Sequence, residues 1–284
     1  MVTMETVLSW REFDDAIAAA DSGSGEPHAR SSLVFRGLAR ATYRNRSSIE
    51  RLGHGAAALE PHLIRNFRKY AHREQPGPSM WDWLSLAQHH GLPTRLLDWT
   101  FSPLVAAHFA TATSPGAEAV VWAVDCVQAH QQLPGELRDP LEAEGAMVFT
   151  TELLAEHSPT LEALDALGDE APFVLFFEPP SLDDRIVNQS AVLSVMSGAA
   201  ASMDDWLDDH EGLAHAWRIT ADAKAEIRER LDRVNINERV LMPGLDGLAA
   251  WLRRYYTPVD GEPLADGGTM VPPVAAGNDQ GEPR

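Results

Sequence analysis

Residues 91–100 read Gly-Leu-Pro-Thr-Arg-Leu-Leu-Asp-Trp-Thr, and this stretch decides how the chain around it folds. Its glycine ends a preceding helix, and its proline holds the next residues extended, which favours a strand over residues 96–100. Ser102 and Pro103 supply a helix N-cap followed by proline at the first helical position, so we expect a helix over 103–112. A strand that leads directly into a helix gathers free backbone N–H groups and short polar side chains, which suits ligand recognition.

Helices and strands alternate on both sides of this stretch without a regular βαβ repeat. Helices are expected at residues 10–20, 59–72, 80–90, 151–157, 203–209, 221–233 and 245–256. Strands are expected at residues 32–37, 119–125, 145–150, 172–177, 191–196 and 213–219. We therefore predict an α+β fold with mixed or antiparallel sheets flanked by helices. The inner face of the last helix is predicted to consist of apolar residues at helical spacing: Leu245, Leu248, Ala249, Leu252 and Tyr255.

The sequence divides into three predicted parts. Residues 1–29 are expected to form an N-terminal helix and a polar linker, residues 30–258 one domain, and residues 259–284 a disordered tail. The N-terminus lacks the basic and apolar features of a secretory signal. No apolar stretch approaches the roughly 20 residues needed to span a bilayer. We expect a cytoplasmic protein with no membrane partner.

Charge is distributed unevenly along the chain. The 23 Lys and Arg residues against 42 Asp and Glu residues give a formal net charge of −19, which argues against a dedicated DNA-binding module. Residues 28–73 are nevertheless rich in arginine and poor in acidic residues. This basic region either binds an anion such as phosphate or pyrophosphate, or forms ion pairs with the acidic C-terminal half. The sequence leaves both readings open.

Several classes of site are excluded by residue type and spacing. The single cysteine, Cys126, rules out an intramolecular disulfide and a cysteine-cluster metal site, and its apolar neighbours predict that it is buried. His89 and His90 are adjacent and project in different directions, so we predict no metal site. The chain lacks a Gly-x-Ser-x-Gly elbow, a Walker-type loop and a dinucleotide-binding glycine fingerprint, which argues against hydrolase, P-loop and Rossmann functions.

Three groups of polar residues are candidates for a functional site. Asp98 and Thr100 share one face of the expected strand, although Asp98 could instead cap the following helix. Arg36 lies in a Phe-Arg-Gly tripeptide at the end of another strand, and its planar guanidinium suits phosphate or carboxylate. The alternative for this arginine is a structural salt bridge. Gln189 and Glu178 each stand at the end of an expected strand, where they face a ligand or are simply solvated.

These motifs resemble those of a known domain. The Phe-Arg-Gly tripeptide at 35–37 and the 14-residue segment 87–100, Ala-Gln-His-His-Gly-Leu-Pro-Thr-Arg-Leu-Leu-Asp-Trp-Thr, look like the FRG domain. Residues 185–189 and 243–249 are similar to that family's closing elements, so the resemblance covers about residues 30–255. The long middle motif carries the resemblance, because a tripeptide alone is not specific. The family's layout is similar to that of the ADP-ribosyltransferases.

The resemblance implies an NAD-consuming ADP-ribosyltransferase, such as a bacterial toxin or anti-phage effector, that modifies a protein or nucleic-acid acceptor. An effector of this kind could require a neutralising partner protein. In one branch of that superfamily an aromatic-Arg-Gly strand holds NAD, which Arg36 matches. A strand bearing Ser or Thr shapes the nicotinamide pocket, which Thr100 or Ser102 matches. A later strand supplies a glutamate, but Gln189 stands there in this chain.

A carboxylate offsets the positive charge that builds on the ribose far better than an amide does, so Asp98 or Glu178 must supply it if Gln189 occupies the third position. The resemblance thus implies this catalytic set: Arg36, Asp98, Thr100, Glu178 and Gln189. It implies these residues for NAD binding: Arg36, His89, Thr94, Arg95 and Ser102. The alternatives are a non-catalytic module that keeps the cleft and binds nucleotide or nucleic acid, and a structural interaction domain.

Overall fold

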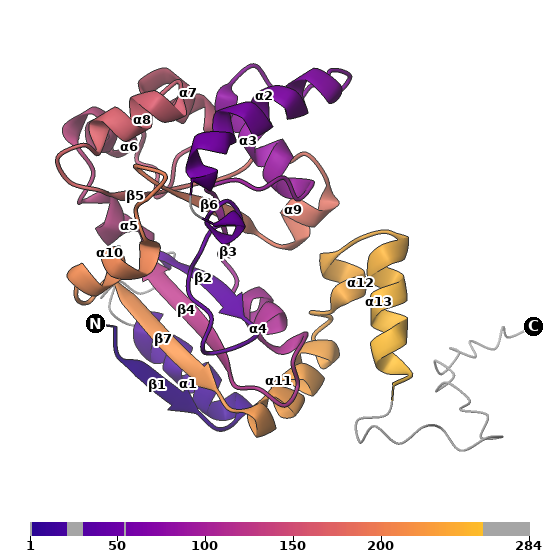
Figure 1. The fold of residues 1–284 in the computed structure, drawn as a ribbon. Helices are drawn as coiled ribbons and strands as arrows, with labels where there is room; N and C mark the ends of the chain where they lie inside the picture. Colours follow the sequence, from indigo (N-terminus) through magenta and orange to yellow (C-terminus); the bar gives the residue numbers. More distant parts are fainter. Residues whose placement is uncertain (1, 22–30, 54, 258–284) are drawn as a thin grey trace, which may run out of the picture.

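The computed structural model describes residues 2–21, 31–53 and 55–257, so the predicted linker at 22–29 and the predicted tail at 259–284 lie outside the described residues. Within that part of the chain, seven strands form one mixed sheet (Figure 1). The strands are β1 (Met4–Val7), β2 (Leu33–Leu38), β3 (Leu97–Thr100), β4 (Ala119–Asp125), β5 (Val174–Phe177), β6 (Ala191–Met196) and β7 (Ala214–Ile219). Their order in space is β1-β7-β4-β2-β3-β6-β5, with β1 parallel to β7 and the other neighbours antiparallel.

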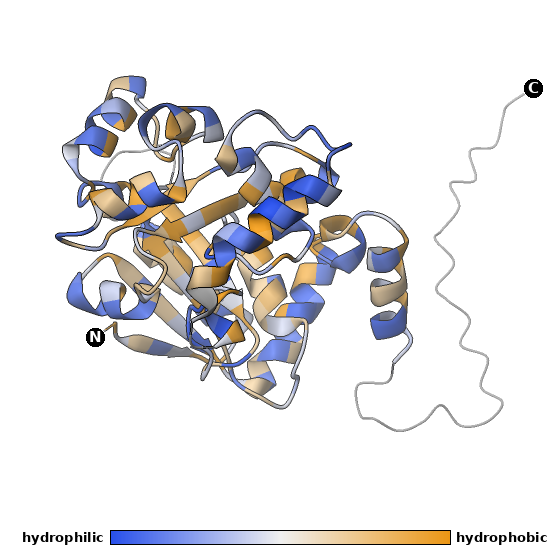
Figure 2. Cartoon of the chain, turned by 45° about the horizontal axis from the view of Figure 1, so that its top comes forward, coloured by the Kyte–Doolittle hydropathy of each residue, from blue (hydrophilic) through white to orange (hydrophobic). Residues whose placement is uncertain are grey.

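Helices flank this sheet, which confirms the predicted α+β class. The helices before β5 are α1 (Trp10–Asp21), α2 (Glu60–Tyr70), α3 (Met80–His89), α4 (Pro103–Thr111), α5 (Cys126–His130), α6 (Gly135–Glu144), α7 (Thr151–His157) and α8 (Leu161–Leu167). Those after it are α9 (Asp184–Asn188), α10 (Met203–Asp209), α11 (Ala221–Arg233), α12 (Glu238–Leu241) and α13 (Leu245–Tyr255). Short 3₁₀ turns lie at Glu50–Leu52 and Ala56–Leu59. Figure 2 shows the hydrophobic strands inside and mixed hydropathy on the surrounding helices.

The sheet consists of two halves that meet at one residue pair. Strand β2 pairs with β4 along its whole length, and β3 pairs with β6 along its whole length. Between β2 and β3 only Phe35 and Thr100 are paired. Beyond this pair the half β1-β7-β4-β2 diverges from the half β3-β6-β5.

Three apolar clusters follow from this division. One cluster spans both halves on one face of the sheet and contains Leu97 and Trp99 of β3. On the opposite face, residues of α1, α4 and α11 pack against the first half, and residues of α3, α6, α7 and α8 pack against the second. Because side chains alternate along a strand, Asp98 and Thr100 point to this opposite face, between the two clusters.

Three predictions about individual elements were wrong. Residues 145–150 do not form a strand, because the pairing there is limited to an isolated bridge between Phe149 and Phe177. Strand β1 was not expected, yet it forms one edge of the sheet. The predicted inner face of the last helix is also incorrect, since Leu245 is 82% exposed. Gly247 is buried instead, and a Cβ there would lie 1.8 Å from the carbonyl oxygen of Met242. The helix therefore packs through its smallest residue.

Candidate functional site

A pocket of about 170 Å³ lies where the two halves of the sheet diverge. Its walls come from β2, β3, α4, α9 and the start of β6. The lining residues are Phe35, Arg36, Gly37, Asp98, Trp99, Thr100, Val105, Ala106, Phe109, Arg185, Gln189, Ala191, Val192 and Leu193. Pockets for drug-sized ligands enclose roughly 300–1,000 Å³. This pocket therefore has room for one ring or sugar but not for a whole drug-sized molecule.

Arg36 occupies the gap between the halves. Its Nη1 donates a hydrogen bond to the backbone oxygen of Asp98. Asp98 lies on β3 beyond the single residue pair that joins β3 to β2. Its Nε is buried and has no hydrogen-bond partner among the described residues. Burial lowers the pKa of the guanidinium below its ordinary value, and the nearby Asp98 carboxylate partly opposes this effect. The predicted alternative, a salt bridge, is not found with any carboxylate in the described part of the chain, and the Nε donor remains unpaired there.

Gly37 lets α4 pack directly on β2. A Cβ at this position would lie 1.8 Å from the carbonyl oxygen of Ala106 and 2.7 Å from the backbone nitrogen of Ala110. The glycine is therefore required by the close approach of a backbone, as strand glycines often are. The same approach brings Val105, Ala106 and Phe109 of α4 to the pocket beside Arg36.

Asp98 is the one carboxylate among the described residues that line the pocket. Both of its oxygens accept hydrogen bonds from Nε2 of Gln88, at 3.1 and 3.0 Å. Oε1 of Gln88 accepts in turn from the hydroxyl of Thr94. This chain of hydrogen bonds fixes the carboxylate, and Asp98 does not cap the following helix, because Ser102 does so. Gln88 was not singled out from the sequence, although it lies inside the long sequence motif.

Thr100 shapes the pocket wall through its hydroxyl. Its Oγ1 donates to the backbone oxygen of Gln189 at 2.6 Å and accepts from the backbone nitrogen of Ser102 at 3.0 Å. The Ser102 hydroxyl accepts from the backbone nitrogen of Val105 at 3.3 Å as the N-cap of α4. Thr100 therefore joins β3 to α9, whereas Ser102 starts the helix and does not line the pocket.

Gln189 and Glu178 lie in different surroundings. Gln189 caps the C-terminus of α9 and lines the pocket, and its Nε2 donates to the carbonyl oxygen of Leu241 at 2.8 Å. Glu178 follows β5, which is separated from β3 by β6, and its side chain is exposed outside the pocket. Of the carboxylates considered from sequence, the structure brings only Asp98 beside Arg36.

The other proposed NAD ligands do not line the pocket. Arg95 is buried and pairs with Glu60 at 2.6 Å and with Asp165. Its guanidinium thus forms structural ion pairs that connect the start of β3 to α2 and α8. The interpretation of Arg95 as a nucleotide ligand is corrected accordingly. Thr94 is fully buried, and its backbone nitrogen donates to the hydroxyl of Ser48 at 2.9 Å.

His89 lies beside the site. Its Nε2 is 2.8 Å from a carboxylate oxygen of Asp183, the N-cap of α9. Burial lowers the pKa of His89 below its ordinary value, with Asp183 opposing the shift and the positive charge of Arg185 adding to it. His89 therefore connects α3 to α9, and the positive charge of Arg185 lies close enough to affect the His89 ring.

Ion pairing with the C-terminal half, one of the two readings of the basic region, is found for Arg44. Arg44 pairs with Asp204 at 2.9 Å and with Asp205 at 2.7 Å, which agrees with ion pairing to the C-terminal half. Arg36 has no carboxylate partner among the described residues and faces the pocket. The prediction that Cys126 is buried is confirmed, and burial raises the pKa of its thiol to about 12.

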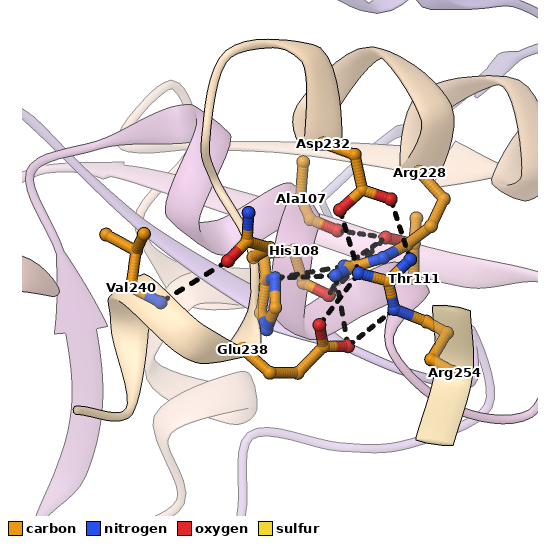
Figure 3. A network of polar contacts seen from close by, with 9 residues as sticks. Ala107, His108, Thr111, Arg228, Asp232, Glu238, Val240 and Arg254 are labelled. Atoms are coloured by element: carbon orange, nitrogen blue, oxygen red, sulfur yellow. Dashed lines mark hydrogen bonds and ion pairs between the residues drawn. The ribbon is translucent and has the colours of Figure 1, made fainter. Parts of the chain in front are cut away.

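A buried charge network, not expected from the sequence, holds the pocket wall α4 to the C-terminal helices (Figure 3). Arg228 of α11 donates to Nδ1 of His108 at 2.9 Å and pairs with Glu238 at 3.2 Å. Arg254 of α13 pairs with Glu238 at 2.8 Å and with Asp232 at 2.7 Å. Burial and Arg228 lower the pKa of His108 to about 4, so the neutral ring accepts from the guanidinium. Burial acts to raise the pKa of Glu238, but hydrogen bonds from Arg254 outweigh it and lower it to about 2.

Two further properties concern the described residues as a whole. No three His, Cys, Asp or Glu side chains in that part of the chain gather closely enough to bind a metal ion. Among the described helices, none has both the length and the apolar character required to cross a membrane.

Comparison with known proteins agrees with the motifs that build the pocket. The model of the FRG domain matches residues 31–118, a segment that includes β2, α3, β3 and α4. No curated protein and no solved structure matches the chain. The matched segment supplies Arg36, Gly37, Asp98 and Thr100, whereas Arg185 and Gln189 follow it. This match supports the resemblance to the FRG domain over residues 31–118.

Proposed function

We propose that this protein is an ADP-ribosyltransferase, which uses NAD as substrate and transfers ADP-ribose to a protein or nucleic-acid acceptor. The observation that carries the proposal is the convergence of Arg36 and Asp98 in one small pocket between diverging strands. The resemblance of the motifs to an ADP-ribosyltransferase layout supports the same assignment. A role as a bacterial toxin or anti-phage effector follows from that resemblance alone.

The proposed reaction replaces one bond at the ribose. The bond between the nicotinamide nitrogen and C1′ breaks, and its electron pair leaves with nicotinamide. An acceptor nucleophile then forms a bond to C1′ and releases its proton. Positive charge builds on the ribose in between, and a carboxylate held in a fixed position beside the ribose stabilises that charge.

The described residues divide these tasks among themselves. The Asp98 carboxylate, held by Gln88, would stabilise the ribosyl cation and receive the acceptor's proton. Arg36, whose Nε has no partner, would hold an anionic or carbonyl oxygen of NAD. The pocket volume of about 170 Å³ fits the nicotinamide ring, while the rest of the dinucleotide lies outside. Gln189 would act as a wall residue, because its amide is bound to Leu241.

Transfer of labelled ADP-ribose to an acceptor measures this proposal directly, and nicotinamide release is measured in parallel. The purified chain is incubated with NAD labelled in the adenylate part together with a cell lysate, and labelled protein and RNA are separated. We expect Asp98→Asn to lower turnover by about 100-fold or more, since a carboxylate acting on the transition state is lost. Glu178→Gln is the matched control, because that carboxylate is likewise exposed but lies outside the pocket.

Folding of each variant is verified by urea denaturation before turnover is compared. Wild-type turnover in Asp98→Asn, or a loss confined to Glu178→Gln, would contradict the assignment of the carboxylate. Complete absence of NAD cleavage by the wild-type chain over hours would contradict the transferase itself.

A non-catalytic nucleotide- or nucleic-acid-binding module is the second candidate. It is favoured by the amide of Gln189, which stands at the position where the related enzymes have glutamate and is already bound to Leu241. This candidate predicts saturable binding of NAD or an oligonucleotide in calorimetry, without release of nicotinamide.

A further inference from the structure

Partly or fully buried arginines in the described residues fall into two groups. Those with a carboxylate within 4.0 Å are Arg95, Arg138, Arg218, Arg228 and Arg254. The two without such a partner are Arg36 and Arg185, and both line the same pocket. A chain with a net charge of −19 has ample carboxylates to neutralise them. Their lack of a partner at one site is therefore informative.

Neither of the two acidic residues that precede Arg185 pairs with it among the described residues. Asp183 accepts from the backbone nitrogen of Ile186 at 3.1 Å and binds His89 at 2.8 Å. Asp184 is exposed and makes no ion pair among the described residues. The positive charge of Arg185 is felt at His89, whose pKa it helps to lower. Arg185 thus retains an unneutralised charge at the edge of the pocket.

The two guanidinium groups enter the pocket from different elements. Arg36 comes from β2, and Arg185 from α9, the helix that Thr100 and Gln189 attach to the pocket wall. Two arginines outnumber the single lining carboxylate, Asp98, so the pocket is locally positive. A guanidinium presents parallel N–H donors that match phosphate oxygens in pairs, and partial burial strengthens such contacts.

We infer that Arg185 and Arg36 together bind a diphosphate, with Arg185 as a phosphate-binding residue that the sequence motifs did not identify. The inference rests on the proposed function in that the diphosphate would be the one that links the two nucleosides of NAD. The ring of the ligand then occupies the pocket, and the two phosphates lie at its mouth between β2 and α9.

Isothermal titration of the full chain with ADP and, separately, with inorganic pyrophosphate tests this inference. Arg185→Gln and Arg36→Gln are compared with Arg230→Gln, which removes one exposed arginine from α11 outside the pocket. We expect Arg185→Gln to weaken both ligands at least about tenfold, because charge-assisted hydrogen bonds to phosphate are lost. Arg230→Gln should bind as the wild type does. Urea denaturation shows whether Arg185→Gln remains folded.

The outcomes separate this inference from the proposed function. Equal binding by Arg185→Gln and the wild type, or no ADP binding by the wild type, would overturn the role of Arg185. An equal loss in Arg230→Gln would also overturn it, since the effect would then be nonspecific attraction. Nicotinamide release is measured on the same samples. Binding that depends on Arg185 without NAD cleavage keeps the diphosphate site and rejects the transferase.

Discussion

Replacing Gly37 by alanine should destabilise the protein strongly, because the added methyl group meets backbone rather than a movable side chain. The new Cβ would lie 1.8 Å from the carbonyl oxygen of Ala106, whereas real Cβ atoms essentially never approach closer than 3.0 Å. Helix α4 would therefore have to move by roughly 1 Å away from β2. Overpacking of this kind costs about 1–3 kcal/mol, and backbone obstacles place Gly37→Ala near the upper end.

A partial offset comes from the unfolded chain. Alanine has fewer accessible backbone conformations than glycine, which contributes about 0.5–1 kcal/mol in favour of the variant. The net loss expected for Gly37→Ala is about 2 kcal/mol in the free energy of unfolding. Urea denaturation measures it, and the slope of the transition should remain unchanged if the fold is preserved.

Gly116→Ala is the matched control. A Cβ at Gly116 would meet nothing within 4 Å, so this substitution should leave stability unchanged or slightly improved. The reasoning is refuted if Gly37→Ala unfolds within about 0.5 kcal/mol of the wild type, the range typical of neutral surface changes. Folded Gly37→Ala should also bind ADP more weakly, since α4 carries part of the pocket wall.

Two other predictions concern buried polar groups. Arg95→Met should lower the free energy of unfolding by about 3 kcal/mol or more, because it leaves the buried Glu60 carboxylate without its partner. The ADP affinity of the folded variant should not change. Urea denaturation and calorimetry measure the two quantities, with the surface substitution Arg73→Met as control. Burial lowers the pKa of His130 from 6.5 to about 4, so the stability due to its neutral ring is present above pH 6.5 and lost as pH falls toward 4. This loss reaches about 3 kcal/mol, and unfolding curves of His130→Gln, which cannot titrate, should show a smaller decline over that range.

The long motif was predictable because its signals are local. The Ser102 cap and the proline after it started α4 where expected, and the alternation of β3 placed Asp98 and Thr100 on one face. Which residues share a pocket depends on strand order instead. Glu178 and Asp98 are both carboxylates at strands, but β6 separates the strands that carry them. No local pattern encodes that separation.

Arg95 and the charge network show the same limit. Arg95 lies in the most recognisable part of the sequence, yet its partners Glu60 and Asp165 are far from it along the chain. His108, Arg228 and Arg254 come together only because α4, α11 and α13 pack against one another. Tertiary structure determines which charged residues form long-range ion pairs. The sequence therefore shows which residues are charged but not which of them are partners.

The single pair that joins β2 to β3 also determines what can be excised from this chain. The recognised segment ends at residue 118, one residue before β4 begins, and it contains neither β4 nor β6. An isolated fragment of residues 31–118 would hold two strands that share only Phe35 and Thr100, each with its long edge unpaired. Such edges aggregate readily. The smallest autonomous unit must therefore include β4 and β6 and extend at least through residue 196. The matched motif thus marks a segment within a larger domain rather than the boundaries of that domain.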